Sequence, residues 1–577
     1  MKDLITISSS VLPSSTRVVG VRGVEAISRP YQFEIFIVVK GDQDELDLAD
    51  TIGAKAMLEL DRENDGIPPF PFAGILASVE LLHEYGGQAL LRAVMVPKLW
   101  LLGLSRHSRI FTRKRITEVI QAVLEENGIS GDDVKMRLGS YEVEEHITQY
   151  RESDLDFLSR WMEREGIFYW FEHGEDGEKL VLCDDRSYDA DEIGKPVRYF
   201  PQTGQDGSAG ASLRSFTCLH ATLPAQVRLK DYDYARPNLN ISGLATVDPN
   251  GVGEVSLYGE RFFTPSAGQK LARIRAEELL ARQVVYRGAG TRFHLRPGYT
   301  FELEDHPRSS FNARYLGMEV RHHGNQAAGL DHFRQIMQLE HEDVYFVELT
   351  AIPGGTQFRA ESRAPWPRIY GYENGTVDGA ADSDYAQIDD QGRYNVKFKF
   401  DESALKNGQA STFVRMMQPH GGAVEGFHFP LRKGTEVICS YLGGDPDRPV
   451  IVGVVPTAVT PSKVVSSNHT QNIIQTGGAN YITIEDSAGA QYINVFCPIF
   501  NTNLYLGSPR PPGPHSLTLP SGPQVPASGP RKRDALGPFA FDLRTDGSGQ
   551  VHAGGNLNVD ADAELQIEAG ALTTIYA

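Results

Sequence analysis

The chain has 577 residues, and at roughly 150 residues per domain this length predicts three or four domains rather than one core. Apolar residues make up 41% and charged residues 23%, a composition that predicts folding and excludes general disorder. The formal net charge of −19 repels phosphate backbones and anionic lipids. We therefore expect no nucleic-acid partner, and the basic triplets at residues 113–115 and 531–533 are assigned to solvated surface.

Cysteine usage and the length of apolar runs exclude further classes of protein. The four cysteines, Cys183, Cys218, Cys439 and Cys497, form no C-x-x-C pair, so neither a zinc ribbon nor a disulfide scaffold is indicated. The N-terminus lacks an apolar segment of signal-peptide length, and the longest apolar run, residues 35–39, is far shorter than the ~20 residues of a membrane span. We expect a protein of a reducing cytosol without Sec export or membrane insertion.

The first hundred residues predict strands, and a helix follows. Residues 31–39 alternate between polar and apolar side chains before closing as an apolar run, and residues 73–81 are also strand-like, which indicates a β-barrel or sandwich. A helix is predicted from about residue 112 to residue 127, where Asn127 and Gly128 supply a stop. Its apolar face consists of Ile116, Val119, Ile120, Val123 and Leu124.

The sharpest helix signal comes next. Ser153 is a candidate N-cap for a helix that begins at Asp154, and Gly166 is a candidate stop. Leu158 and Met162 belong to its apolar stripe. The aromatic run at residues 167–171 that follows directly predicts a strongly packing strand.

The remainder predicts more β-structure, in separate parts. Residues 190–350 are strand-like apart from one helix at about 267–282. A proline-rich segment near 353–368 marks a boundary between domains. Beyond it, roughly 90 residues with about five strands and glycine-rich corners match the size of an OB-type barrel. The predicted domains are a first β-barrel (1–110), a helical insert (111–189), a second β-barrel (190–355), an OB-fold domain (356–460) and a C-terminal β-helix (461–577).

The C-terminal part alternates strictly over residues 557–569. The side chains predicted to point inward are Leu557, Val559, Ala561, Ala563, Leu565, Ile567 and Ala569. One such strand has too little apolar surface to form a core alone, whereas three copies wound around one axis would fill a narrow shared interior. An intertwined homotrimer is therefore predicted. A proline-rich loop at about residues 508–533 interrupts its strands, because proline cannot continue a hydrogen-bonded ladder.

Catalytic and metal-binding signatures are few. The sequence has no G-x-S-x-G, H-E-x-x-H or P-loop motif and no EF-hand loop. His322, His323 and His341 lack helical i, i+4 spacing and a nearby cysteine, so a structural role is expected for them. Asp184, Asp185 and the carboxylates at 42–50 lie in polar segments, where carboxylates are usually solvated loop residues rather than catalytic groups. We expect no enzyme activity, cofactor or metal.

Residues 149–171, which read QYRESDLDFLSRWMEREGIFYWF, closely resemble the signature of the VgrG spike proteins of bacterial type VI secretion systems. Further matching segments occur in the family's order, among them RPYQF at 29–33, LRPGYTF at 295–301 and GGDPDRPVIVG at 443–453. The signature residues assigned a structural role in the hub are Tyr150, Glu152, Ser153, Asp154, Phe157, Arg160, Glu163, Gly166, Ile167 and Tyr169.

The resemblance implies a mechanical role. It implies a mainly β trimer in which two hub β-barrels with a helical insert seat on the hexameric Hcp tube, followed by an OB-fold neck and a triple-stranded, intertwined β-helix needle. A PAAR-repeat protein at the tip, effector or adaptor proteins and baseplate components are the implied partners, and membranes are only targets to be pierced. The implied location is the bacterial cytoplasm before firing, with delivery into a target cell afterwards.

The sequence departs from the family pattern in its C-terminal part. The needle is short and interrupted, and the 16 residues from 456 to 471 leave no room for the lysozyme domain of the phage relative. The chain stops at Ala577 after repeat-like text, so we expect no toxin domain. The alternatives are the spike of an extracellular phage-like contractile system and an enzyme that degrades cell walls.

Overall fold

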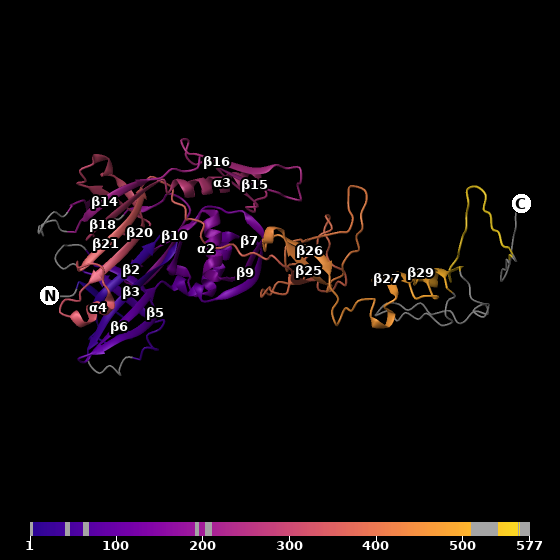
Figure 1. Cartoon of the computed structure of the whole chain (residues 1–577), viewed down its shortest axis with the longest axis horizontal. Helices are drawn as coiled ribbons and strands as arrows, with labels where there is room; N and C mark the ends of the chain where they lie inside the picture. Colours follow the sequence, from indigo (N-terminus) through magenta and orange to yellow (C-terminus); the bar gives the residue numbers. More distant parts are fainter. Residues whose placement is uncertain are drawn as a thin grey trace. The chain divides into compact units, whose positions relative to one another are not determined.

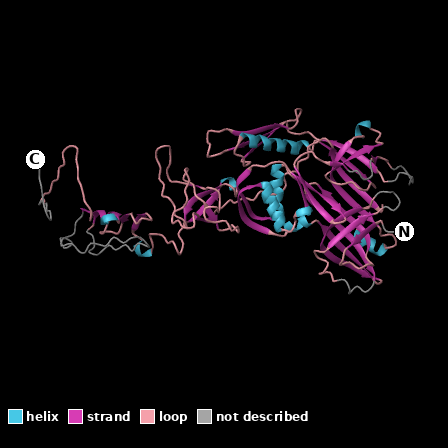
Figure 2. Ribbon diagram, turned by 180° about the vertical axis from the view of Figure 1, so that it is seen from behind, coloured by secondary structure: helices cyan, strands magenta, loops and turns pink. Residues whose placement is uncertain are grey.

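The computed structural model describes residues 4–40, 47–61, 68–190, 196–201, 211–508, 541–562 and 565. The chain divides into two compact units, Met1–Val455 and Pro456–Ala577. Strands dominate the described residues (Figures 1 and 2), so the predicted mainly β fold class is confirmed.

One large sheet organises the described part of the first unit. Its main path runs β1-β4-β5-β6-β3-β2-β20-β21-β18-β14, with β19 paired to β20 and the short β12 and β13 paired to β19. The strands are β1 (Ile5–Ser8), β2 (Arg17–Ala26), β3 (Arg29–Lys40), β4 (Lys55–Leu60), β5 (Phe70–Tyr85), β6 (Gln88–Val96), β12 (Asp189–Ala190), β13 (Val197–Arg198), β14 (Leu213–His220), β18 (Val284–Gly290), β19 (Tyr299–Glu304), β20 (Arg314–Asn325) and β21 (Tyr345–Pro353).

The two halves of this sheet are joined by strands that lie far apart in the sequence. β2 pairs with β20 in antiparallel fashion from Gly20 to Ala26. The amide of Gln326 strengthens the joint, since its Oε1 accepts a hydrogen bond from Leu4 N at 2.7 Å and its Nε2 donates to Val18 O at 3.0 Å. The core beneath is aromatic, and its fully buried rings include Phe33, Phe70 and Phe72. The predicted β-rich segments before residue 110 and after residue 190 thus share one sheet.

The helical part lies between these halves in the sequence. β7 (Arg106–Arg115) pairs with β9 (Val143–Ser153), and α1 (Ile116–Glu126) follows β7. The helix predicted from residue 112 therefore begins later, because residues up to Arg115 belong to a strand that finds its partner in β9. The other elements are α2 (Asp154–Glu165) and the three-stranded sheet of β8 (Val134–Arg137), β10 (Phe168–Gly174) and β11 (Gly177–Cys183).

A small sheet covered by a helix follows within the first unit. It contains β15 (Gln226–Asp231), β16 (Ile241–Thr246) and β17 (Glu254–Tyr258), and α3 (Pro265–Leu280) packs along it (Figure 1). The approach of helix and strand is close, because a Cβ on Gly243 would lie 2.0 Å from Gly268 O. Helix α4 (Asp331–Met337) was not predicted.

The last sheet of the first unit has five strands among the described residues: β22 (Glu373–Val377), β23 (Val396–Phe398), β24 (Arg415–Met416), β25 (Glu436–Tyr441) and β26 (Pro449–Val454). Two predicted strands are corrected here. The strand expected at Ile369 begins only at Glu373, and the one expected over 392–400 is limited to β23, since Tyr394 forms only isolated bridges to Ile388 and Val414.

The second unit contains an antiparallel sheet of consecutive strands in its described part: β27 (Gln471–Gln475), β28 (Tyr481–Glu485), β29 (Tyr492–Cys497), β30 (Thr502–Gly507) and β31 (Phe541–Arg544). The predicted strands at 480–486 and 491–496 are confirmed as β28 and β29. Most of the predicted proline-rich loop lies outside the described residues.

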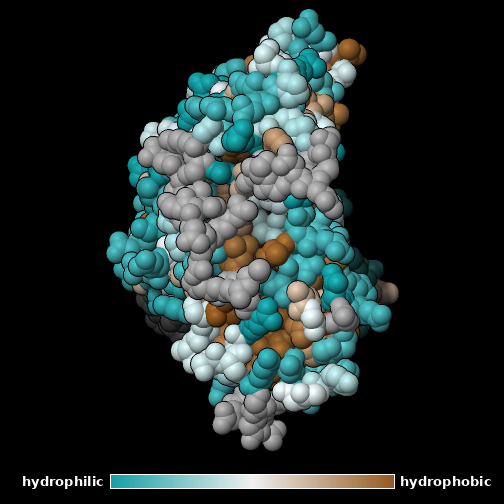
Figure 3. Space-filling model, turned by 90° about the vertical axis from the view of Figure 1, so that its left-hand side faces the viewer, coloured by the Kyte–Doolittle hydropathy of each residue, from teal (hydrophilic) through white to brown (hydrophobic). Residues whose placement is uncertain are grey.

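The surface of the first unit is mixed in character. In Figure 3, hydrophobic patches lie in the middle and lower parts of the displayed face, between polar side chains. Within the described ranges, no helix combines the length and the apolar character needed to cross a membrane.

Candidate functional site

Helix α2 carries most of the sequence signature and is fixed at both ends. Ser153 Oγ accepts a hydrogen bond from Asp156 N at 3.0 Å, which confirms the predicted N-cap. Gly166 adopts a left-handed conformation with φ 76° and confirms the predicted stop. The helix buries Phe157 and Trp161 completely.

A buried ion pair ties α2 to the preceding strand. Arg160 Nε donates to Glu152 Oε2 at 2.8 Å, while Nη2 donates to Glu152 Oε1 at 2.6 Å and to Thr148 O at 2.8 Å. The Trp366 ring lies 4.4 Å from Arg160 Cζ. Burial raises the pKa of Glu152, and this effect exceeds the opposing influence of the Arg160 guanidinium. Because desolvation offsets much of the attraction, the pair specifies geometry more than it adds net stability.

The buried charges continue into the turn between β25 and β26. Thr148 N donates to Asp447 Oδ1, and Arg261 lies 2.5 Å from Asp447 Oδ2 and 3.4 Å from Asp445 Oδ2. The Arg261 side chain is only 8% exposed. We call Glu152, Arg160, Arg261, Asp445 and Asp447 the junction cluster. It connects the helical part, the segment between β17 and α3, and the five-stranded sheet of the first unit.

Other signature residues also contact segments that are distant in the sequence. The Tyr150 hydroxyl donates to the carboxylate of Glu373 in β22. Glu163 Oε2 accepts a hydrogen bond from Ala364 N at 3.0 Å, and burial raises the pKa of Glu163 to about 7. Asp154 Oδ1 lies 3.1 Å from a guanidinium nitrogen of Arg109, Gly166 O accepts from Arg359, and Ile167 and Tyr169 are buried. These contacts support the structural role expected of the signature.

The second unit exposes its apolar side chains on one face of a sheet. Thr483 and Glu485 on β28 are each 9% exposed, whereas Ile482 and Ile484, which alternate with them, are 36% and 40% exposed. Cross-strand register continues this face over five strands. We define the apolar face as Ile474, Ile482, Ile484, Ile493, Val495, Leu504, Leu506, Phe541 and Leu543. Water-exposed apolar rows of this extent mark an interaction surface.

The predicted needle core is only partly within the described residues. Leu557, Val559 and Leu565 are 55–62% exposed, and Ala561 is exposed as well. Residues 557–562 form no strand in the single chain, and the inward assignment, which depends on three copies around one axis, stays a prediction. No strand forms because an isolated alternating segment buries too little apolar area to hold itself. Ala563, Ile567 and Ala569 lie outside the described residues.

One buried carboxylate lies between two histidines in the large sheet. Glu25 Oε2 is 3.0 Å from His322 Nε2, and Glu25 Oε1 is 3.2 Å from His173 Nε2. His322 Nδ1 lies 2.8 Å from the Tyr345 hydroxyl. Burial acts to raise the pKa of Glu25, but hydrogen bonds from the two histidines outweigh it and lower the pKa to about 2. The group resembles a proton relay, yet the carboxylate, His322 and Tyr345 are all buried, so it holds the core together.

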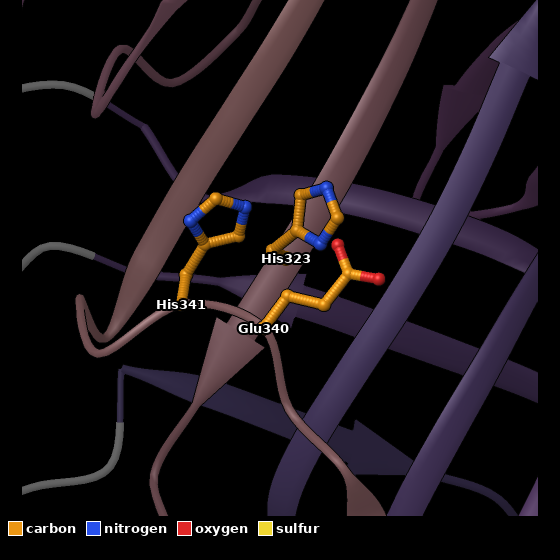
Figure 4. A group of neighbouring side chains, drawn as sticks. All are labelled: His323, Glu340 and His341. Carbon is orange, nitrogen blue, oxygen red and sulfur yellow. The ribbon is translucent and has the colours of Figure 1, made fainter.

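A second group of titratable side chains lies nearer the surface. His323, Glu340 and His341 place one ligand atom each within 4.8 Å of one another (Figure 4). Of the three histidines considered from the sequence, the structure therefore brings His323 and His341 together and separates His322.

Of the remaining candidate carboxylates, Asp184 and Asp185 have ordinary partners, while residues 42–46 lie outside the described residues. Asp184 Oδ2 accepts hydrogen bonds from Gly139 N at 2.8 Å and from the Tyr141 hydroxyl at 2.7 Å. Asp185 Oδ1 accepts from Ser187 N at 2.9 Å, as in a local turn. Both positions act as hydrogen-bond acceptors that shape loops.

Sequence relatives agree on one family. The family model for the phage tail baseplate hub (GPD) matches residues 24–328, and the model for the type VI secretion system/phage-baseplate injector OB domain matches residues 383–455. The chain is 31% identical over 504 residues to the type VI secretion system spike protein VgrG5 of Pseudomonas aeruginosa, covering 83% of this chain and 61% of that protein. It is 30% identical over 518 residues to VgrG1b of the same organism, covering 85% and 66%. The chain thus spans about three fifths of the length of VgrG5.

Solved structures share the fold. One is a component of the E. coli type VI secretion system with structural similarity to the T4 bacteriophage tail proteins gp27 and gp5, with a TM-score of 0.56, 20% identity, and 78% of this chain and 100% of that chain covered. Another is the lidded Francisella PdpA-VgrG complex, with a TM-score of 0.58, 8% identity, and 85% and 75% covered. Because the hub model alone covers more than half of the sequence, the chain belongs to the phage tail baseplate hub family, and its predicted resemblance to VgrG spike proteins is confirmed.

Proposed function

We propose that the chain is one of three subunits of the puncturing spike of a type VI secretion system. The apolar face of the second unit carries this proposal. Six of its side chains, those of Ile474, Ile482, Ile484, Ile493, Val495 and Leu506, are 36–46% exposed in the single chain. Three copies around one axis would cover them and would leave no subunit able to peel away alone under axial force.

Each predicted domain is assigned one part of the spike. Residues 1–110 and 190–355 form the hub around the insert at 111–189, residues 356–460 form the neck, and residues 461–577 form the needle. The shared thirteen-stranded sheet of the described first unit supports treating the two hub segments as one rigid body. The OB-domain match at residues 383–455 supports the neck. In this arrangement the junction cluster transmits force from neck to hub, because buried, fully specified contacts resist sliding better than a solvated linker.

The partners follow from the family. The hub base seats on the hexameric Hcp tube, a PAAR-repeat protein caps the needle, and effector or adaptor proteins and baseplate components attach to the spike. The P. aeruginosa relatives are named type VI spike proteins, which supports this machine over other contractile systems. Before firing the protein resides in the bacterial cytoplasm, and firing delivers it into the target cell. Its role is mechanical rather than enzymatic.

Native mass spectrometry of the full chain at micromolar concentration tests the assembly. The expected species has three times the chain mass of 63.7 kDa. A monomer at that concentration would overturn the proposal. A secretion assay tests separately whether the protein belongs to a type VI secretion system. A strain that lacks the Hcp tube should retain the protein inside the cell, and release that is independent of Hcp would point to an extracellular phage-like system.

A further inference from the structure

The cluster of His323, Glu340 and His341 combines two imidazoles with one carboxylate. His323 lies near the end of β20, and the other two residues lie in the loop that leads into β21. In Figure 4, the His323 ring lies between the His341 ring and the Glu340 carboxylate in this view. The two rings pack edge to face with centroids 4.5 Å apart. One ligand atom from each of the three residues lies within 4.8 Å of the others, close enough for one ion to contact all three after small rotamer adjustments.

His323 supplies a second, independent observation that points to a ligand. Its Nε2 atom is buried, yet it has no hydrogen-bond partner, and the nearest carboxylate oxygen, on Glu348, is 3.9 Å away. Buried polar atoms without a partner are rare in folded proteins, since each costs desolvation free energy.

The surroundings keep the ligands available and in place. The His341 ring stacks on Phe346 at 4.1 Å, and Asn325 Nδ2 donates to His341 O at 2.8 Å, so the loop backbone is held beside β20. Arg214, the guanidinium next to Phe346, is occupied by a bidentate pair with Asp343. Within the described ranges, no lysine or arginine forms an ion pair with Glu340, whereas the nearby Glu342 and Asp343 pair with Arg334 and Arg214.

We propose that His323, Glu340 and His341 bind a divalent transition-metal ion, Zn²⁺, as a structural clasp. Imidazole nitrogen and carboxylate oxygen are the ligands that Zn²⁺ accepts, and three protein ligands leave a fourth position for water or for Glu348. The ion links the loop before β21 to β20, and thereby steadies the end of these two interior strands of the large sheet. The sequence led us to expect no metal, because the ligands come from a strand end and a loop rather than from a compact motif.

The test uses the full chain without an affinity tag, loaded with Zn²⁺ and passed through gel filtration in metal-free buffer. The wild type should retain one equivalent of Zn²⁺ by mass spectrometry of the metal. The double variant His323→Gln, His341→Gln should bind at least about 100-fold more weakly, the upper end of what loss of even an outer-shell partner costs. His332→Gln removes an exposed histidine of α4 outside the cluster and should keep the wild-type affinity.

A second variant separates metal loss from misfolding. Glu340 is exposed, so Glu340→Gln should leave the circular dichroism spectrum unchanged while it weakens Zn²⁺ binding and changes the visible absorption of the Co²⁺-loaded protein. Loss of Zn²⁺ from the wild type during gel filtration would overturn the proposal. Retention of one equivalent by both cluster variants would also overturn it, since the ion would then be bound elsewhere. Neither outcome bears on trimer assembly, which native mass reports independently.

Discussion

Replacing Ile484 by aspartate tests whether other copies of the chain cover the apolar face. Full burial of an isoleucine side chain contributes ~1.5–3 kcal/mol of free energy. Because Ile484 is 40% exposed in the single chain, about two fifths of this free energy, roughly 1 kcal/mol, is released only when other copies cover it. Six comparably exposed side chains give about 6 kcal/mol per chain and about 18 kcal/mol per trimer. Ile484→Asp removes the contribution of this side chain in each of three copies. It also adds a charge in each copy, which costs several kcal/mol to desolvate. We expect the trimer to dissociate or to melt at a clearly lower temperature.

Size-exclusion chromatography with light scattering and a thermal melt measure both quantities on the same sample. The matched control is Ala488→Asp, which places the same charge in the exposed turn between β28 and β29 and should leave mass and melting temperature unchanged. If Ile484→Asp kept the trimeric mass together with the wild-type melting temperature, the face would be solvent-exposed in the assembly and the reasoning would be refuted.

Three further predictions concern buried and exposed charges. Arg160→Met leaves a buried carboxylate unpaired and should lower the free energy of unfolding by about 3–5 kcal/mol in a denaturant titration. Arg113→Met breaks only an exposed pair and should cost less than about 1 kcal/mol; equal effects would contradict the assigned burial. Because the pKa of Glu25 is lowered from 4.5 to about 2, its ionised form stabilises the fold above pH ~4.5, and this contribution should disappear as the pH falls toward 2. The stability difference between wild type and Glu25→Gln should shrink over that window, and a constant difference would contradict it. Leu565→Asp should make the needle tip sensitive to proteolysis while Asp562→Asn stays silent; equal cleavage would reject the inward assignment.

Local rules predicted the elements whose signals are local. Ser153 and Gly166 mark the two ends of α2 because capping and left-handed backbone depend on nearest neighbours. The start of α1 was missed because residues 112–115 suit both strand and helix, and pairing with β9 decides between them. The sheet that joins β2 to β20 was missed for the same reason, since its partners are separated by roughly 300 residues.

The sites show a similar limit. The sequence identified Glu152 and Arg160 as signature residues, but their connection to Asp447 depends on a tertiary contact across almost 300 residues. The alternation of Ile482 and Ile484 was visible, yet alternation alone does not say which face meets water, and here the apolar side chains are the exposed ones. His322 and His323 looked equivalent as neighbours. Consecutive residues of a strand point to opposite faces, so one reaches Glu25 in the core and the other reaches His341.

The pairing of β2 with β20 has a consequence for synthesis on the ribosome. β2 ends at Ala26, and its partner is complete only at Asn325. At about 5–20 residues per second, β2 emerges about 15–60 s before β20 exists. During that interval the growing chain presents an unpaired strand edge, which is the kind of surface that recruits chaperones or pairs with a neighbouring nascent chain. The large sheet therefore closes late in translation, and the edge of β2 that β20 will cover stays open until then.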